Sequence, residues 1–294
     1  MSLAGGGIPH GYMYIQTWRR NLKKVGIPSN YYANVVNART KGIHGKLSRL
    51  NTLNTRLFDS ELFPDSGYQI NGNLFTRDWK PVSKAQFYKY IFSKSDRCVF
   101  KVDSSNKGLG VEVVDRGNID AVISKRQDGV FRDLVVADDR LTIFSKKSTP
   151  TLRLTTVVET DGSTSLRAAY LRVGRDADSF VKSASHIRIP LDLETGVCAP
   201  KAYLPDWMPI STHPDTSVSF EGRVVPGYEK CVAAAVSLHA RVPQISCIGW
   251  DVIVDDTGKV KFFEWNGEVN DIKFTEALTG PGFLNLGWEN LWRG

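Results

Sequence analysis

Cysteine is scarce in this sequence of 294 residues, which has four: Cys98, Cys198, Cys231 and Cys247. They form no C-x-x-C pair and their spacings match no zinc-binding pattern, so a dithiol redox motif and a structural zinc site are excluded. Cys98 and Cys247 lie beside apolar residues. Free cysteine is mostly buried, and disulfides are rare in reducing compartments. We therefore expect buried, reduced thiols in a cytoplasmic protein.

Long apolar runs are also absent. No stretch reaches the roughly 18 residues that a membrane-spanning helix needs, and residues 1–7 lack the pattern of a signal peptide. Hydrophobic residues are 41% and charged residues 23% of the chain, which excludes a disordered or collagen-like protein. The length suffices for one large domain or two smaller ones.

Acidic residues are few in the first third of the chain. Residues 1–100 contain 15 Lys or Arg and 5 Asp or Glu, a net charge of +10, whereas residues 101–294 contain 23 and 26, a net charge of −3. The basic character of the whole protein, +7, therefore belongs to the first third. This distribution suits a nucleic acid, an acidic lipid or a phosphate-bearing ligand, and it equally suits a solvated surface.

Helix and strand patterns alternate without a regular βαβ order, which favours an α+β fold over a doubly wound sheet. The periodicity predicts helices over residues 11–25, 83–94 and 228–240, and partly helical structure over 30–63. It predicts strands over residues 98–102, 111–114, 151–159, 165–173, 187–191, 245–254 and 260–265.

Two carboxylates and an amide are expected to meet on the last two strands. The turn Asp255–Gly258 joins these strands as a hairpin, which places Asp251 near Glu264. Glu264 and Asn266 are two residues apart and so share a face of their strand. Oxygen ligands of this kind suit Mg²⁺ that also binds phosphates. The alternative is ordinary alternation, in which these polar residues face water.

Basic side chains within apolar strands form the second group of candidates. Lys101 ends a strand and precedes a loop of small residues, 103–110, that is not a Walker A motif. A lysine so placed can reach a phosphate, and small residues let backbone N–H groups approach it. Arg153 and Arg172 lie within two further apolar strands, where an arginine usually pairs with a carboxylate or a phosphate. A common hairpin loop and surface arginines are the alternatives.

The order of these features resembles the ATP-grasp superfamily. A strand ending in Asp, a hairpin and then Glu-x-Asn is the magnesium signature of that superfamily, and Asp251 and Glu264 are 13 residues apart. Within it, the chain looks most like the sugar-transfer-associated ATP-grasp family. The residues that carry this likeness are Thr149–Thr156, Ile189–Gly196, His213–Asp215, Val225–Tyr228 and Ile248–Asp251.

The resemblance implies an ATP-grasp fold of two α+β lobes, with the nucleotide bound between antiparallel sheets. It implies a reduced N-terminal helical segment (1–45), a small lobe with the phosphate loop (46–135) and a C-terminal lobe with the metal site (136–294). Asp251, Glu264 and Asn266 would hold Mg²⁺, with Mn²⁺ as an alternative ion. Arg153 and Arg172 would be catalytic and steady the transferred phosphoryl group. The residues implied for ATP are Lys101, Ser104, Ser105, Gly108, Gly110, Val136, Asp138 and Asp139.

The activity implied by the family is an ATP-dependent ligation of a carboxylate to an amine or thiol through an acyl phosphate. The acceptor would be an anionic carboxylate or a sugar-derived molecule, in the biosynthesis of cell-surface polysaccharide or glycoconjugate. One alternative is an ATP-binding protein without ligase activity, because the segments Val136-Ala137 and Ser185-His186 depart from the family pattern. Another is a nucleic-acid-binding protein that uses the basic first third, although no nucleic-acid-binding motif is present.

Overall fold

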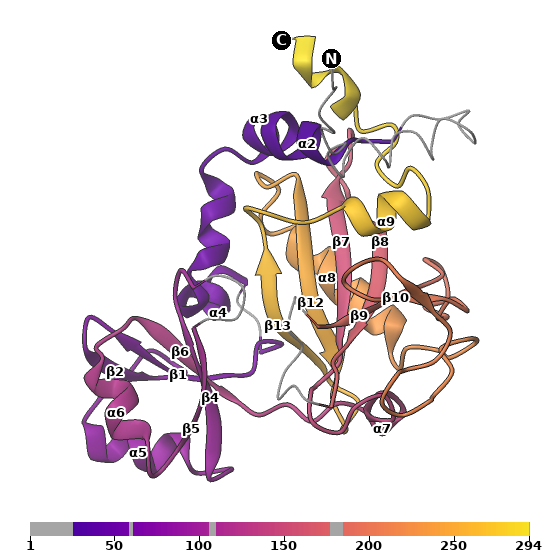
Figure 1. The fold of residues 1–294 in the computed structure, drawn as a ribbon. Helices are drawn as coiled ribbons and strands as arrows, with labels where there is room; N and C mark the ends of the chain where they lie inside the picture. Colours follow the sequence, from indigo (N-terminus) through magenta and orange to yellow (C-terminus); the bar gives the residue numbers. More distant parts are fainter. Residues whose placement is uncertain (1–25, 59–60, 106–109, 177–184, 294) are drawn as a thin grey trace, which may run out of the picture.

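Two antiparallel sheets form the two lobes of the protein (Figure 1). The computed structural model describes residues 26–58, 61–105, 110–176 and 185–293. The helix expected over residues 11–25 lies outside these ranges. Within them, the mixture of sheets and helices confirms the predicted α+β class.

The smaller sheet has the strand order β3-β2-β1-β6-β4-β5. Its strands are β1 (Asp65–Ile70), β2 (Asn73–Thr76), β3 (Pro81–Val82), β4 (Arg97–Val102), β5 (Val111–Asp115) and β6 (Gly129–Asp133). Helices α5 (Lys84–Ile91) and α6 (Ile119–Ser124) cover one of its faces (Figure 1). The ring of Phe87 in α5 packs 5.1 Å from that of Phe131 in β6, so the buried face of this helix rests on the sheet. Ser83 begins α5 with a capping box that it forms with Gln86.

The larger sheet has the strand order β11-β10-β9-β8-β7-β12-β13. Its strands are β7 (Thr151–Val158), β8 (Thr164–Val173), β9 (Ile187–Pro190), β10 (Ala202–Tyr203), β11 (Pro209–Ile210), β12 (Cys247–Val254) and β13 (Val260–Asn266). Helix α8 (Tyr228–His239) lies behind this sheet in Figure 1 and packs on β7 and β8. Side chains alternate between faces, so Leu152 and Leu154 enter the core while Arg153 projects from the opposite face.

A run of short helices connects the upper end of the larger sheet to the smaller lobe (Figure 1). It consists of α2 (Ser29–Tyr31), the π-helix η1 (Tyr32–Val36), α3 (Asn37–Lys41), the 3₁₀ helices η2 (His44–Arg49) and η3 (Asn51–Leu53), and α4 (Asn54–Phe58). Phe58, at the end of α4, packs edge-on against Trp250 and Trp265 of the larger sheet. The partly helical structure predicted over residues 30–63 is therefore confirmed, and its last turn joins the core of the larger lobe.

The remaining short helices lie on the larger lobe. They are α7 (Asp139–Thr142), α9 (Lys273–Leu278) and η4 (Trp288–Arg293). The buried carboxylate of Glu276 in α9 accepts backbone N–H groups of Ile27 (2.9 Å) and Gly282 (2.7 Å), which ties the beginning of the described chain to its end.

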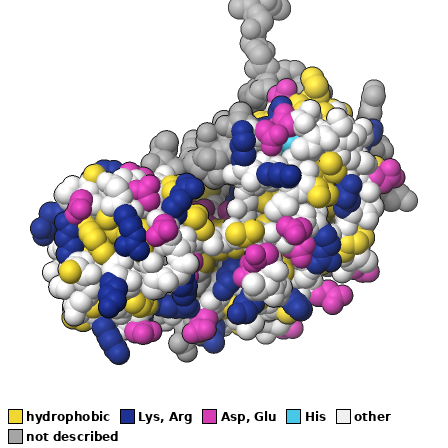
Figure 2. All heavy atoms as spheres, turned by 90° about the horizontal axis from the view of Figure 1, so that it is seen from below, with side chains coloured by type: hydrophobic (Ala, Val, Ile, Leu, Met, Phe, Trp, Pro, Cys, Tyr) yellow, Lys and Arg dark blue, Asp and Glu magenta, His cyan; other side chains and the backbone are white. Residues whose placement is uncertain are grey.

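All four cysteines are buried and unpaired, as expected. No helix in the described ranges is long and apolar enough to cross a membrane. Viewed from below, Lys and Arg side chains are spread over both lobes among acidic ones (Figure 2). The domain boundaries at residues 45/46 and 135/136 remain predictions.

His239 is one of two buried histidines among the described residues, the other being His213. Its Nδ1 lies 2.6 Å from Thr156 Oγ1, and its Nε2 lies 2.7 Å from the carbonyl oxygen of Ile245. Burial lowers its pKa from 6.5 to about 4, because the charged imidazolium would lose its hydration.

This shift predicts a pH-dependent loss of stability. The unfolded ring takes up a proton below pH 6.5, whereas the folded ring stays neutral to about pH 4. The stabilisation that comes from keeping the His239 ring neutral is therefore complete above about pH 6.5, and it is lost as the pH falls toward 4. When the pH is lowered from 7 to 4.5, the free energy of unfolding of the wild type, measured in urea titrations, is expected to fall. In His239→Gln the fall is expected to be smaller by about 2–3 kcal/mol, because glutamine takes up no proton. The exposed His44→Gln variant is the control, and equal pH slopes for all three proteins would contradict the assignment.

Candidate functional site

Strands β12 and β13 bring the predicted carboxylates together. Asp251 is directly opposite Glu264 in the ladder, and Gly249 is opposite Asn266. The register shifts immediately after Asp251, where a bulge begins. The amide nitrogen of Asn266 donates to the carbonyl oxygen of Gly249 at 3.1 Å, which leaves the amide oxygen of Asn266 as its ligand atom. The hairpin predicted from the sequence therefore exists, with Asp251 and Glu264 as cross-strand neighbours.

Both predicted arginines contact Asp251. Arg153 lies opposite Asp251 on β7 and donates through Nε to Oδ1 (2.5 Å) and through Nη2 to Oδ2 (3.0 Å). Arg172 of β8 places Nη2 2.6 Å from the same Oδ2. Only 4% of Asp251 and 8% of Arg153 are exposed to solvent. Burial alone would raise the pKa of Asp251, but the two guanidinium groups outweigh it and hold that pKa well below its usual range.

Asn270 supports this ion group from behind. Its side-chain oxygen lies 3.4 Å from Arg153 Nη1, and its nitrogen donates to Thr155 Oγ1 at 3.1 Å. A Cβ atom at position 249 would come within 2.0 Å of that oxygen. Gly249 is therefore required by the close approach of Asn270 to β12.

Lys101 reaches the site from the other lobe. Its Nζ lies 3.3 Å from Glu264 Oε1, with 11% of the lysine side chain and 40% of the glutamate side chain exposed. Burial lowers the pKa of Lys101, and Glu264 opposes this by favouring the charged ammonium. The structure thus joins Lys101, which the sequence analysis assigned to phosphate binding, to one of the predicted metal ligands.

Two further contacts between the lobes were missed from the sequence. Arg132 of β6 donates across the lobes to the carbonyl oxygen of Phe263 in β13 at 2.5 Å. Within the smaller lobe the same guanidinium donates to Asp65 Oδ1 at 2.7 Å. Arg49 forms an ion pair with Glu268, two residues beyond the end of β13. Arg132 lies within an apolar strand, the signal that identified Arg153. Arg49, from the basic first third of the chain, thus pairs with an acid of the less basic remainder.

The donor set suits a hard divalent cation. A carboxylate offers about four lone-pair positions, and three N–H groups occupy those of Asp251, so one position on Oδ1 remains. The described residues contain no group of three or more His, Cys, Asp or Glu side chains arranged for a metal. Asp251, Glu264 and the oxygen of Asn266 would therefore hold Mg²⁺ only partly and leave positions for phosphate oxygens, as Mg²⁺ prefers.

The loop after β4 begins in an ordered turn. The N–H of Ser104 donates to the carbonyl oxygen of Arg49 at 2.7 Å, and Ser105 Oγ donates to that of Val102 at 2.8 Å. The backbone of Gly110 lies close to Ser105, so that a Cβ atom at position 110 would come within 2.4 Å of Ser105 Cβ. Gly108 lies outside the described residues. Asp103 accepts from both the N–H and the hydroxyl of Thr52, so η3 anchors the base of this loop.

The segment predicted to join the lobes is attached to the β12–β13 hairpin. The carbonyl oxygen of Val136 accepts from Asp256 N (3.0 Å), and Asp138 N donates to the carbonyl oxygen of Val254 (3.2 Å). The Asp138 carboxylate caps α7 and pairs with Arg140, whereas Asp139 is exposed. Asp138 is thus already engaged, and of the two acids Asp139 is the more accessible.

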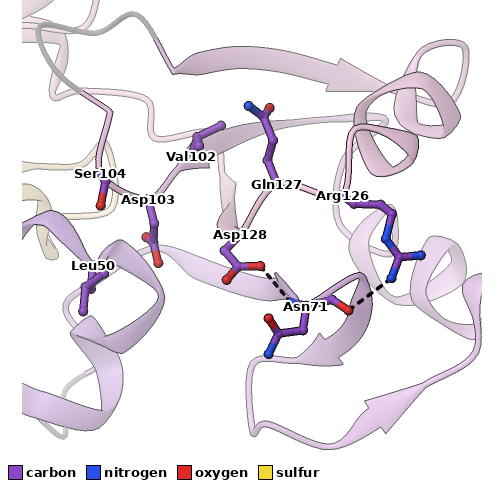
Figure 3. A pocket seen from close by; sticks show the side chains of 8 residues that line it. All are labelled: Leu50, Asn71, Val102, Asp103, Ser104, Arg126, Gln127 and Asp128. Carbon is purple, nitrogen blue, oxygen red and sulfur yellow. Dashed lines mark hydrogen bonds between the residues drawn. The ribbon is translucent and has the colours of Figure 1, made fainter.

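A cavity of about 710 Å³ lies at the end of the smaller sheet (Figure 3). Its lining residues are Leu50, Asn71, Val102, Asp103, Ser104, Arg126, Gln127 and Asp128. Asn71 is held there by Asp128, which accepts its N–H at 2.7 Å, and by Arg126, which donates to its carbonyl oxygen at 3.4 Å. Ser104 is the one predicted site residue in its lining, so this cavity is not the place where Lys101 and Glu264 meet.

One family model matches most of the chain. A family model described as "Sugar-transfer associated ATP-grasp" matches residues 92–289, which include Lys101, both arginines and the three predicted metal ligands. No curated protein matches the chain. The family match confirms the predicted ATP-grasp resemblance and its fold.

Solved structures of ATP-grasp type are similar at low identity. The biotin carboxylase domain of the Hydrogenobacter thermophilus 2-oxoglutarate carboxylase, with MgADP and bicarbonate, is 12% identical, with a TM-score of 0.49 and 83% of this chain and 45% of that chain covered. N5-carboxyaminoimidazole ribonucleotide synthetase from Thermotoga maritima is 10% identical (TM-score 0.44, 78% and 45% covered). The ATP-grasp ligase PsnB with its minimal precursor is also 10% identical, with a TM-score of 0.46 and 86% of this chain and 63% of that chain covered. The chain spans between 45% and 63% of the length of these structures.

The buried ion group predicts a large effect of removing one arginine. Arg153→Met leaves Asp251 with Arg172 alone, so we expect the free energy of unfolding to fall by about 3 kcal/mol in denaturant titrations. Arg116→Met breaks an exposed ion pair with Asp96 and is expected to leave stability unchanged. Equal stability of the two variants would contradict the importance assigned to the Asp251 contacts.

Proposed function

Because the chain belongs to the sugar-transfer associated ATP-grasp family, we propose that it is an ATP- and Mg²⁺-dependent ligase. It joins a carboxylate to an amine or thiol through an acyl phosphate. The description of the family supports an acceptor in the biosynthesis of cell-surface polysaccharide or glycoconjugate. The four buried, unpaired cysteines support a cytoplasmic location.

The contact between Lys101 and Glu264 is the observation that carries this proposal. It places a lysine of the smaller lobe 3.3 Å from the carboxylate of the larger lobe, next to Asp251 on the neighbouring strand. A cation and a pair of carboxylates facing each other across two lobes form a site for a phosphate chain and its metal. Bound Mg²⁺ supplies neutralisation of charge on the transferred phosphoryl group.

The residues of this chain act by binding and positioning. Lys101 would bind the phosphates of ATP, together with backbone N–H groups of Ser105 and Gly110, whereas the N–H of Ser104 is engaged with the carbonyl oxygen of Arg49. Asp251, Glu264 and Asn266 would hold the metal. Arg153 and Arg172 keep Asp251 ionised, and Arg172 presents the larger share of exposed surface for contact with the phosphoryl group, 14% against 9% of the side chain. Such groups would accelerate the reaction by positioning the substrates and by stabilising the charge of the transferred phosphoryl group.

The segment between the lobes would bind the nucleoside. Val136 is exposed, and its carbonyl oxygen accepts from Asp256 in the turn of the hairpin whose strands carry the predicted metal ligands. Of the two acids, Asp139 is favoured for the ribose hydroxyls, because Asp138 is engaged with Arg140.

Calorimetric titration with Mg²⁺-ATP tests the site. Glu264→Gln and Lys101→Met are each expected to weaken binding about tenfold or more, since a charge-assisted contact is lost. The exposed pair of Glu112 and Lys125 in the smaller lobe offers matched controls, Glu112→Gln and Lys125→Met, which are expected to bind as the wild type does. Binding that ignores Mg²⁺, or Glu264→Gln that binds as its control does, would contradict the proposal.

Release of ADP separates the ligase from its alternatives. We expect ADP formation to be stimulated by a carboxylate and an amine supplied together, with acidic sugars among the carboxylates. Tight Mg²⁺-ATP binding without turnover across a broad panel would favour the nucleotide-binding protein without ligase activity. Salt-dependent binding of DNA or RNA that ATP leaves unchanged would favour the nucleic-acid-binding alternative.

A further inference from the structure

One of the short helices at the upper end of the larger sheet, α3, ends in a buried lysine (Figure 1). Only 2% of Lys41 is exposed. Its Nζ lies 3.3 Å from the hydroxyl oxygen of Tyr32 and 5.4 Å from the centre of that ring. None of the ion pairs found in the described part of the chain includes Lys41. A buried ammonium without a nearby negative charge is costly, so a counter-charge is needed close to it.

The contacts continue from Tyr32 to Cys247, the first residue of β12. The Tyr32 hydroxyl lies 3.2 Å from Cys247 Sγ. Tyr32 begins the π-helix η1, and π-helical turns are rare and often occur at functional sites. Because an ammonium group can only donate, the Tyr32 oxygen accepts from Lys41 and the hydroxyl hydrogen points to the sulfur. Cys247 is therefore an acceptor on this side.

Cys247 also accepts from the opposite side. Arg153 can only donate, so the Asn270 atom that lies 3.4 Å from it is the side-chain oxygen. The amide nitrogen of Asn270 then faces Thr155 Oγ1 at 3.1 Å and Cys247 Sγ at 3.7 Å. Two donors thus converge on one sulfur atom, and the described residues offer its own hydrogen no acceptor. A thiolate has no such hydrogen and accepts from both.

Charge balance supports the same assignment. Transfer of the thiol proton from Cys247 to Lys41 gives a thiolate and an ammonium, and the sum of the two charges stays at zero. Burial lowers the pKa of Lys41, and a negative Cys247 opposes this more than Glu268 does. Burial raises the pKa of each of the other three cysteines to about 12, so these remain thiols near neutral pH: Cys98, Cys198 and Cys231.

The other titratable groups that face this cluster do not replace Cys247 as the counter-charge. Glu268 is paired with Arg49, and Asp271 is exposed. Burial, Cys247 and Asp271 raise the pKa of Tyr32 well above its usual range, so its hydroxyl keeps its hydrogen. His239 stays neutral near pH 7, because burial lowers its pKa to about 4 and Lys41 adds to this effect.

We propose that Cys247 is a buried thiolate, balanced by the Lys41 ammonium through the Tyr32 hydroxyl, and that it is a positioning residue for the metal site. The thiolate holds the amide nitrogen of Asn270, so that the amide oxygen faces Arg153, which in turn donates to Asp251. The last step rests on the proposed function, because Asp251 is a metal ligand only under that proposal. The thiolate itself does not depend on it.

Ultraviolet absorbance of the folded protein near neutral pH tests for the thiolate. We expect the wild type to show the absorbance of one thiolate per chain, and Cys247→Ser to lose it. Lys41→Met is also expected to lose it, because the thiolate loses its counter-charge and takes up a proton. Cys231→Ser, which removes another buried cysteine, and Lys46→Met, which removes an exposed lysine nearby, are the controls and are expected to keep it. Thermal unfolding establishes that each variant is folded.

A second measurement on the wild type keeps the test decisive where a variant fails to fold. The protein is labelled with carbon-13 at the Cβ atoms of cysteine and studied by nuclear magnetic resonance. We expect one of the four Cβ signals to have the position of a thiolate near neutral pH, and the other three that of a thiol. Four thiol signals would overturn the proposal.

Calorimetric titration with Mg²⁺-ATP tests the positioning role. Asn270→Ala is expected to raise the dissociation constant about tenfold or more, and Cys247→Ser, which keeps a small polar side chain without the charge, about threefold. Cys231→Ser is expected to bind as the wild type does. Equal binding by Cys231→Ser and Cys247→Ser would overturn the positioning role.

The thiolate and the proposed function can fail separately. Equal absorbance of the wild type and Cys247→Ser, or a thiolate that remains in Lys41→Met, would overturn the ion pair even if Mg²⁺-ATP binds normally. Conversely, a thiolate that depends on Lys41 in a wild type that does not bind Mg²⁺-ATP would contradict the proposed function and support the ion pair.

Discussion

The carboxylate of Asp251 carries a negative charge where almost none of its surface meets water. That charge is tolerable because two guanidinium groups, from Arg153 and Arg172, each donate to it. The three residues lie on β12, β7 and β8, so their contacts join three neighbouring strands of the larger sheet. Asn270 contacts Arg153 from behind, and it fits there because Gly249 has no Cβ atom. A shift in the register of one strand would break all of these contacts.

Strand β13 and the residues after it carry the contacts with the smaller lobe. Arg132 reaches the backbone of Phe263, Lys101 reaches Glu264, and Arg49 reaches Glu268. Glu264 alone among these acceptors is also a predicted metal ligand. The position of the smaller lobe is therefore linked to the carboxylate that the nucleotide and its metal would share.

Much of this arrangement could be predicted from local sequence. The turn Asp255–Gly258 determines the hairpin, and the hairpin register brings Asp251 opposite Glu264. Ser83 marks the start of its helix through a capping box, and Lys101 stands at the end of a recognisable apolar strand. In each case the signal lies within a few residues of the feature, where periodicity and turn chemistry operate.

The partners of the buried charges could not be predicted in this way. Arg153 is 98 residues from Asp251, and Arg132 is 131 residues from the carbonyl oxygen that it contacts. Such pairs depend on strand order, since β7 lies between β8 and β12, and no local pattern encodes that order. For the same reason Asn270 could not be predicted as part of the site, because its contacts are with residues of β7, far away in the sequence.

A crystal structure with a non-hydrolysable ATP analogue and Mg²⁺ tests the central claim most directly. The account predicts phosphate density between Lys101 and Glu264, and a metal held by Asp251, Glu264 and Asn266. Nucleotide bound elsewhere, with the metal ligands empty and the contact between Lys101 and Glu264 unchanged, would contradict it.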